Sequence, residues 1–84
     1  MKLNVDDDVL RIYAQLPHEF RRSDVLAVLV RNGIHYDPNK VSYQLQLMEE
    51  AKMVERISSR KYNKRYDNLE SWWKKRLHEL GVSN

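Results

Sequence analysis

The sequence predicts an α+β fold that is mainly α-helical, and two observations lead to this prediction. Four segments carry apolar residues at the three- and four-residue spacing of amphipathic helices. One basic segment, after the third of them, loosely alternates polar with apolar residues, as a β-hairpin does. The chain has 84 residues, only two glycines and two prolines, and no internal repeat. We therefore expect a single domain over residues 1–84, without a linker.

The first helix is expected over residues 6–16, where Pro17 stops it. Its apolar residues share the helical spacing: Val9, Ile12, Tyr13 and Leu16. The acidic triplet at residues 6–8 suits the positive end of the helix dipole. That role is a sufficient structural reason for the triplet, so we do not interpret these carboxylates as metal ligands.

The second helix is expected to begin with Ser23 as its cap and to end in a left-handed turn at Asn32-Gly33. Its inward-facing residues are predicted to be Leu26, Leu29 and Val30. Phe20, in the connection before it, is expected to be either a core residue or a one-residue edge strand. Ile34 and Tyr36 are expected to anchor the turn that follows.

The third helix is the most informative segment, because residues 37–54 combine a start signal, an apolar stripe and small polar groups. Asp37 can cap the first turn, and Pro38 suits the first helical position. A buried stripe recurs at i, i+4 and i+7: Val41, Leu45 and Met48. Gln44 falls at the edge of the core, where its amide needs a partner.

The polar face of this helix offers groups that can bond to base edges and phosphates. The candidate nucleic-acid contacts here are Asn39, Lys40, Ser42, Tyr43 and Gln46. The alternative is that this face is the solvated side of an ordinary amphipathic helix.

A basic β-hairpin is expected over residues 53–66. Its loop is predicted at residues 60–64, where Asn63 tolerates a positive φ. The candidate nucleic-acid contacts of this hairpin are Arg60, Lys61, Lys64 and Arg65.

A last helix is expected over residues 68–80, capped by Asp67 or Asn68 and closed by Gly81. Its apolar residues form one wide face: Leu69, Trp72, Trp73, Leu77 and Leu80. This face either packs onto the first helix and enlarges the core or forms a homodimer interface. Its width favours the homodimer.

Charge and composition narrow the function classes. The net charge is +3, but residues 52–76 hold nine Lys and Arg against three Asp and Glu, which leaves a net −3 for the rest of the chain. This polarity is typical of a protein with a polyanionic partner. The absence of cysteine excludes disulfides and thiolate metal sites. No apolar run approaches a membrane span and no signal peptide is evident, so we expect a cytoplasmic protein with no membrane partner.

The order of these elements, together with residues 41–56, resembles the winged helix-turn-helix repressors of the ArsR and MarR type. Their recognition helix typically follows the pattern VS-x-x-L-x-x-L-x-x-A-G-L-V, and the matching positions are Val41, Ser42, Leu45, Met48, Ala51, Met53 and Val54. The resemblance implies a helix-turn-helix core over residues 6–52, a wing over residues 53–66 and an extra C-terminal helix. It also implies that Ser42, Tyr43 and Gln46 face the major groove, while Arg60, Lys61 and Lys64 reach the DNA backbone or minor groove.

The chain departs from the family pattern in two respects. Lys52 replaces a glycine at a position that often takes left-handed φ, which costs about 1 kcal/mol and can alter the turn. The cysteine metal box of the metal-sensing members is absent, so metal sensing is not carried over.

The function expected from the sequence is sequence-specific binding of double-stranded DNA by a small homodimeric transcriptional regulator. The alternative is a winged-helix adaptor that binds protein within a larger assembly, and the basic wing favours DNA over this. We expect no enzyme, cofactor, metal or small-molecule substrate. The three histidines lie far apart in sequence, and no phosphate loop or Ser/His/Asp arrangement is present.

Overall fold

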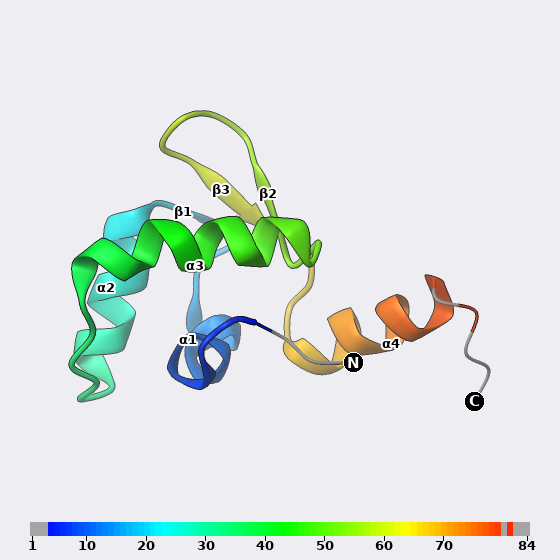
Figure 1. The fold of residues 1–84 in the computed structure, drawn as a ribbon, viewed down its shortest axis with the longest axis horizontal. Coiled ribbons are helices and arrows are strands. Elements are labelled where there is room, and N and C mark those ends of the chain that lie inside the picture. The colour runs from blue at the N-terminus through cyan, green and yellow to red at the C-terminus, as the bar shows by residue number, and fades with distance from the viewer. Residues whose placement is uncertain (1–3, 80, 82–84) are drawn as a thin grey trace.

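The computed structural model describes residues 4–79 and 81 and shows an α+β, mainly helical fold with a small three-stranded antiparallel sheet (Figure 1). The predicted α+β, mainly helical class is thereby confirmed. The helices are α1 (Asp7–Ile12), the short 3₁₀ helix η1 (Tyr13–Gln15), α2 (Arg22–Arg31), α3 (Pro38–Glu50) and α4 (Leu69–Glu79). The strands are β1 (Glu19–Phe20), β2 (Val54–Arg56) and β3 (Tyr62–Lys64).

The sheet has the order β1-β3-β2, so the last strand in the chain lies in the middle. Tyr62 pairs with Phe20 on one side and with Arg56 on the other. Phe20 is buried, and its ring stacks on that of Tyr62 with 5.8 Å between centroids. Phe20 is therefore both a core residue and part of an edge strand, which is two residues long.

The core lies between α1, α2, α3 and the sheet, and α4 contributes one residue to it. Its buried apolar residues are Val5, Val9, Ile12, Tyr13, Leu16, Phe20, Val25, Val28, Leu29, Val41, Leu45, Met48, Met53, Val54 and Trp72. The apolar stripes predicted for the first and third helices are thus confirmed. The first α-helix is shorter than expected, because the chain tightens into η1 before Pro17.

The predictions for α2 need two corrections. The helix begins at Arg22 rather than after Ser23, and the backbone N–H of Arg21 donates to Asp24 Oδ2 at 2.8 Å. Val30 is 71% exposed, and the buried stripe runs through Val25, Val28 and Leu29. The run VLAVLV at residues 25–30 contains two overlapping helical stripes, one that starts at Val25 and one that starts at Leu26. The structure buries the stripe that starts at Val25. The end of α2 is confirmed, since Gly33 has a φ of 73°.

The local signals of α3 are confirmed. Asp37 Oδ1 accepts from the backbone N–H of Asn39 at 2.9 Å, and Pro38 begins the helix. Gln44 is buried, and its Oε1 accepts from the backbone N–H of Asp6 at 2.8 Å, which supplies the partner that its position demands. Lys52 keeps a left-handed φ of 61° at the turn into β2, although it is not glycine.

The hairpin loop spans residues 57–61, not residues 60–64 as predicted. The backbone N–H of Ile57 donates to Lys61 O at 2.9 Å and closes this loop. Asn63 lies in β3, where it pairs with both Glu19 and Glu55. Pairing on two sides requires extended backbone, so Asn63 belongs to the strand and not to the loop.

Helix α4 extends away from the rest of the fold and contacts it mainly through its first turns (Figure 1). Asn68, rather than Asp67, caps it by accepting from the backbone N–H of Ser71 at 2.9 Å. Gly81 follows with a φ of 77°, and Leu80 lies outside the described residues. Within the described part of the chain, no helix has the length and apolar character needed to cross a membrane.

Candidate nucleic-acid interface

A groove of about 790 Å³ lies between the start of α2, one flank of α3 and the β2–β3 hairpin. The start of α2 and the hairpin supply its basic lining: Arg21, Arg22, Arg56 and Arg60. The flank of α3 adds Ser42, Gln46 and Glu49. We call this feature the arginine groove. It brings guanidinium groups beside amide and hydroxyl groups on a helix, a combination that suits phosphates and base edges.

Arg21 and Arg22 enter the groove from the start of α2, and sequence reasoning missed both. Arg22 Nη2 donates to Pro38 O at 2.8 Å, so this side chain also ties the start of α2 to the start of α3. The signal that could have found them is an arginine pair directly before a helix, where exposed backbone amides also favour anions.

Arg56, also missed, organises the hairpin loop. Its Nε donates to Ser58 O at 3.3 Å and its Nη2 to Ser59 O at 3.5 Å. The backbone N–H of Arg60 donates to Ser58 Oγ at 3.4 Å. These bonds hold the loop in shape, and they place Arg60, a predicted contact, in the lining of the groove.

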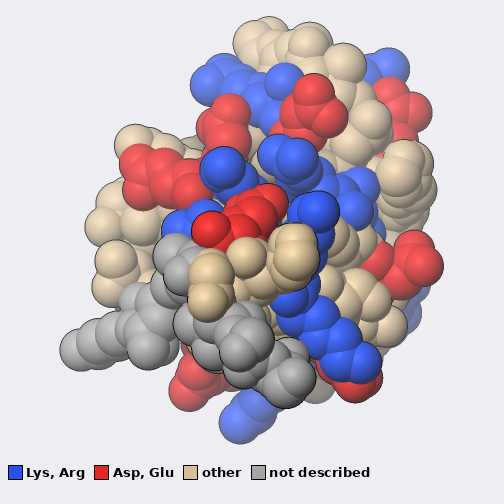
Figure 2. Space-filling model, turned by 90° about the vertical axis from the view of Figure 1, so that its right-hand side faces the viewer, with Lys and Arg blue, Asp and Glu red and all other residues tan. Residues whose placement is uncertain are grey.

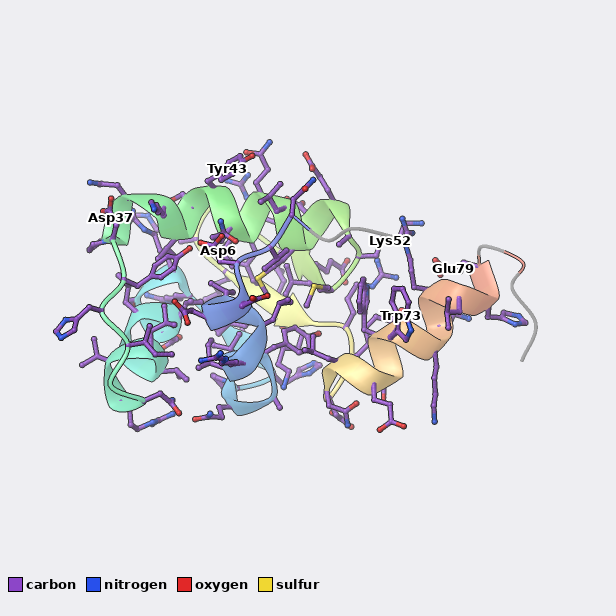
Figure 3. All side chains as sticks on the ribbon, turned by 60° about the horizontal axis from the view of Figure 1, so that its bottom comes forward. Asp6, Asp37, Tyr43, Lys52, Trp73 and Glu79 are labelled. Carbon is purple, nitrogen blue, oxygen red and sulfur yellow. The ribbon has the colours of Figure 1, made fainter. Side chains whose placement is uncertain are left out.

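The predicted contacts on α3 divide into two groups. Ser42 and Gln46 line the arginine groove. Asn39, Lys40 and Tyr43 are exposed but do not line it. Tyr43 is 58% exposed and projects outward from α3 (Figure 3). The five side chains therefore occupy one exposed surface, but only two of them adjoin the arginines.

The opposite flank of α3 is acidic. Asp6, bonded to Gln44 through its backbone, accepts a hydrogen bond from Tyr36 Oη at 2.5 Å. Burial, the hydrogen bond to Asp6 and the nearby charges of Asp8 and Asp37 together hold the pKa of Tyr36 well above its usual value. The two flanks of α3 therefore differ in charge, with arginines beside one and carboxylates beside the other.

Lys64 corrects the predicted hairpin contacts, because it is not at the tip. It lies in the central strand and is only 8% exposed. Its Nζ donates to the backbone oxygens of Ala14, Leu16 and Asp67 at 3.4, 3.2 and 3.1 Å. It also lies 5.1 Å from the centroid of the Tyr13 ring, and burial lowers the pKa of Lys64. This ammonium is engaged within the fold.

The other two predicted hairpin cations lie outside the arginine groove. Lys61 Nζ is 3.6 Å from Glu19 Oε1 in an exposed ion pair, which contributes little to stability. Arg65 is exposed and borders a separate hollow beside His18 and Ser71. The predicted set thus contributes Arg60 to the groove, while Lys61 and Arg65 lie beyond its lining.

The predicted interface residues of α4 also divide. Trp72 is buried, and its Nε1 donates to Ala51 O at 2.7 Å, so within this fold its side chain is engaged by its own chain and presents little surface to a second copy. Trp73 is 36% exposed, and Leu69 and Leu77 are half-buried. Lys74 pairs with Glu70 at 3.2 Å. Figure 2 shows this end of the molecule with Asp and Glu set among Lys and Arg.

The described residues contain no group of three or more His, Cys, Asp or Glu side chains that could hold a metal ion. His18, His35 and His78 are each exposed and lie in different parts of the fold. Comparison with known proteins finds no matching family model, curated protein or solved structure.

Proposed function

We propose that this protein binds double-stranded DNA sequence-specifically, as a small transcriptional regulator with a winged-helix fold. The observation that carries the proposal is the arginine groove beside the exposed side of α3. The element order α1-β1-α2-α3-β2-β3 and the strand order β1-β3-β2 are compatible with that fold.

In this proposal α3 enters the major groove, because an α-helix fits its width. Ser42 and Gln46 bond to base edges, and Asn39, Lys40 and Tyr43 extend the contact along the outer surface of the helix. The four arginines bind phosphates of the adjoining strand, since guanidinium pairs bidentately with phosphate oxygens. The acidic flank near Asp6 faces away from the backbone. Binding in this way needs no cofactor, metal or catalytic group.

We further propose that the protein acts as a homodimer through α4. The outer part of this helix leaves the body of the fold, with Trp73 partly exposed and Leu69 and Leu77 half-buried. A second copy would cover these side chains and place two α3 helices on half-sites roughly 34–36 Å apart. Sedimentation equilibrium at micromolar concentration should give twice the mass of the chain. A monomer would remove the dimer from the proposal.

The DNA proposal is tested by selecting bound duplexes from a random pool and titrating selected and random DNA by fluorescence anisotropy at two salt concentrations. We expect the selected duplex to bind more tightly than random DNA. Gln46→Ala should lose about 1–3 kcal/mol of specific binding and retain random binding. Gln15→Ala, another exposed glutamine but outside the groove, is the control. It removes two hydrogen bonds with Asn32, yet it should leave the affinities for selected and random DNA unchanged.

Equal affinity for all duplexes, or no binding at either salt concentration, would overturn the proposal. In the second case the adaptor function becomes the better account, and the exposed face of α3 would be a protein-binding surface.

A further inference from the structure

Glu49 is the acidic residue in the lining of the arginine groove. It is exposed and lies one residue before the end of α3. From α3 it shares the groove with Ser42 and Gln46, and from the other elements with the four arginines. Its neighbour Glu50 is also exposed but does not line the groove.

The fold offers no structural reason for a carboxylate at this position. Among the described residues, the ion pairs involve Glu19, Glu70 and Glu79, and none involves Glu49. The last turn of a helix carries the negative end of the dipole, which disfavours an anion there. A negative charge also repels the phosphates that the arginines attract. A carboxylate in this groove therefore costs affinity for DNA in general, unless a particular base offers it a hydrogen-bond donor.

We propose that Glu49 determines sequence specificity by accepting a hydrogen bond from the N4 amino group of a cytosine in the major groove. This inference rests on the proposed DNA-binding function and assigns a preferred base to one position of the bound site.

The chemistry of base edges selects cytosine. An ionised carboxylate only accepts hydrogen bonds. In the major groove guanine presents two acceptors, thymine presents an acceptor and a methyl group, and adenine presents an acceptor beside its amino group. Cytosine presents the amino donor alone. A carboxylate can therefore accept a hydrogen bond from cytosine without facing an acceptor atom of the same base.

The position of Glu49 relative to Gln46 agrees with this role. Residues three apart on a helix lie on the same side, with Cβ atoms about 5–6 Å from each other. Gln46 and Glu49 both face the arginine groove, so each can reach a different base pair of the same duplex. We expect a fixed cytosine within one or two base pairs of the position that Gln46 contacts.

The test compares Glu49→Gln with Glu50→Gln, which removes the same charge from the adjacent position. The unaltered protein and both variants are used to select duplexes from a random pool. We expect the unaltered protein and Glu50→Gln to select a cytosine and to prefer it over thymine by about fivefold or more at that position. Glu49→Gln should reduce this preference to less than about twofold. Both variants should bind random DNA somewhat more tightly, because each loses one negative charge.

A second arm leaves the protein unchanged and replaces the selected cytosine with an analogue that lacks the N4 amino group. The unaltered protein should lose affinity, though less than for thymine, which also adds a repelling acceptor, whereas Glu49→Gln should be nearly indifferent. Retained selection of cytosine by Glu49→Gln would overturn this inference and leave the DNA-binding proposal intact. Selection of adenine at that position would also overturn the assignment to cytosine. Failure of the unaltered protein to bind DNA would instead overturn the proposed function.

Discussion

The tip and the root of the β2–β3 hairpin use the same kind of side chain for opposite purposes. Arg60, at the tip, is exposed and lines the arginine groove. Lys64, four residues later at the root, is buried. Its ammonium donates to the backbone oxygens of Ala14, Leu16 and Asp67. A cation at the tip is available to a partner, while a cation at the root is part of the fold.

A count of basic residues does not distinguish a cation that stabilises the fold from one that is available for binding. Removing the root cation should alter the free energy of unfolding, whereas removing a tip cation should alter binding and its salt dependence.

The largest effect is expected from Lys64→Met, which keeps an apolar side chain of similar length and removes the ammonium. Three backbone oxygens then lose their donor, and we expect the free energy of unfolding to fall by about 2–3 kcal/mol. Urea unfolding monitored by tryptophan fluorescence measures this change. Lys61→Met is the matched control, because its exposed ion pair with Glu19 is worth at most about 1 kcal/mol. Equal unfolding midpoints for the two variants would show that the cations at the root and at the tip contribute equally to stability.

The second prediction concerns Tyr13, whose ring lies beside the Lys64 ammonium and whose Oη donates to Met53 O at 2.6 Å. Burial raises the pKa of Tyr13 from 10.0 to about 12. The folded state therefore holds the phenol proton where the unfolded chain has lost it. The free energy of unfolding should fall as pH rises from about 10 to about 12, by up to about 1.4 kcal/mol per pH unit.

Tyr13→Phe lacks this proton, so its stability should depend less on pH over the same window, although it starts about 1 kcal/mol lower at neutral pH for want of one hydrogen bond. Urea unfolding of both proteins at pH 8, 10 and 11 checks the difference. Parallel pH profiles of stability would mean that burial at the root of the hairpin does not raise the pKa of the Tyr13 phenol.

The smallest effect is expected at the tip. Arg60→Ala should weaken binding to selected and random DNA alike by about fivefold, which is ~1 kcal/mol. It should also reduce the slope of log K against log salt by about 0.9, because one phosphate contact is lost. Arg65→Ala removes the same charge outside the groove and should leave the slope unchanged. Anisotropy titrations at several salt concentrations measure both slopes. A lower slope for Arg65→Ala alone would place the DNA on the other side of the hairpin.

The features that sequence predicted well depend on neighbours within one turn of a helix. Asp37 and Pro38 mark the start of α3 by local hydrogen bonding, and helical geometry alone placed Gln44 at the core edge. The resemblance places a left-handed glycine at position 52 and left the turn open to alteration by lysine, but Lys52 keeps that conformation.

The features that sequence missed depend on packing between distant segments. Short strands such as β3 present too few residues to reveal which side faces inward, so Lys64 resembled a surface cation. The arginine groove combines side chains from α2, α3 and the hairpin, and no linear pattern connects Arg21 with Arg56. Trp72 and Trp73 are adjacent, so the sequence alone does not show which of them is buried. The packing of α4 against the end of α3 decides this, because the Trp72 indole donates to Ala51 O.

Two aromatic side chains bond to the turn that follows α3. Trp72 of α4 donates to Ala51 O, and Tyr13 of η1 donates to Met53 O, one residue on either side of Lys52. The left-handed residue is thus flanked by two carbonyls that distant parts of the chain hold in place. A residue other than glycine can keep a positive φ where the surrounding structure fixes the backbone, so α4 and η1 together stabilise the turn from α3 into β2.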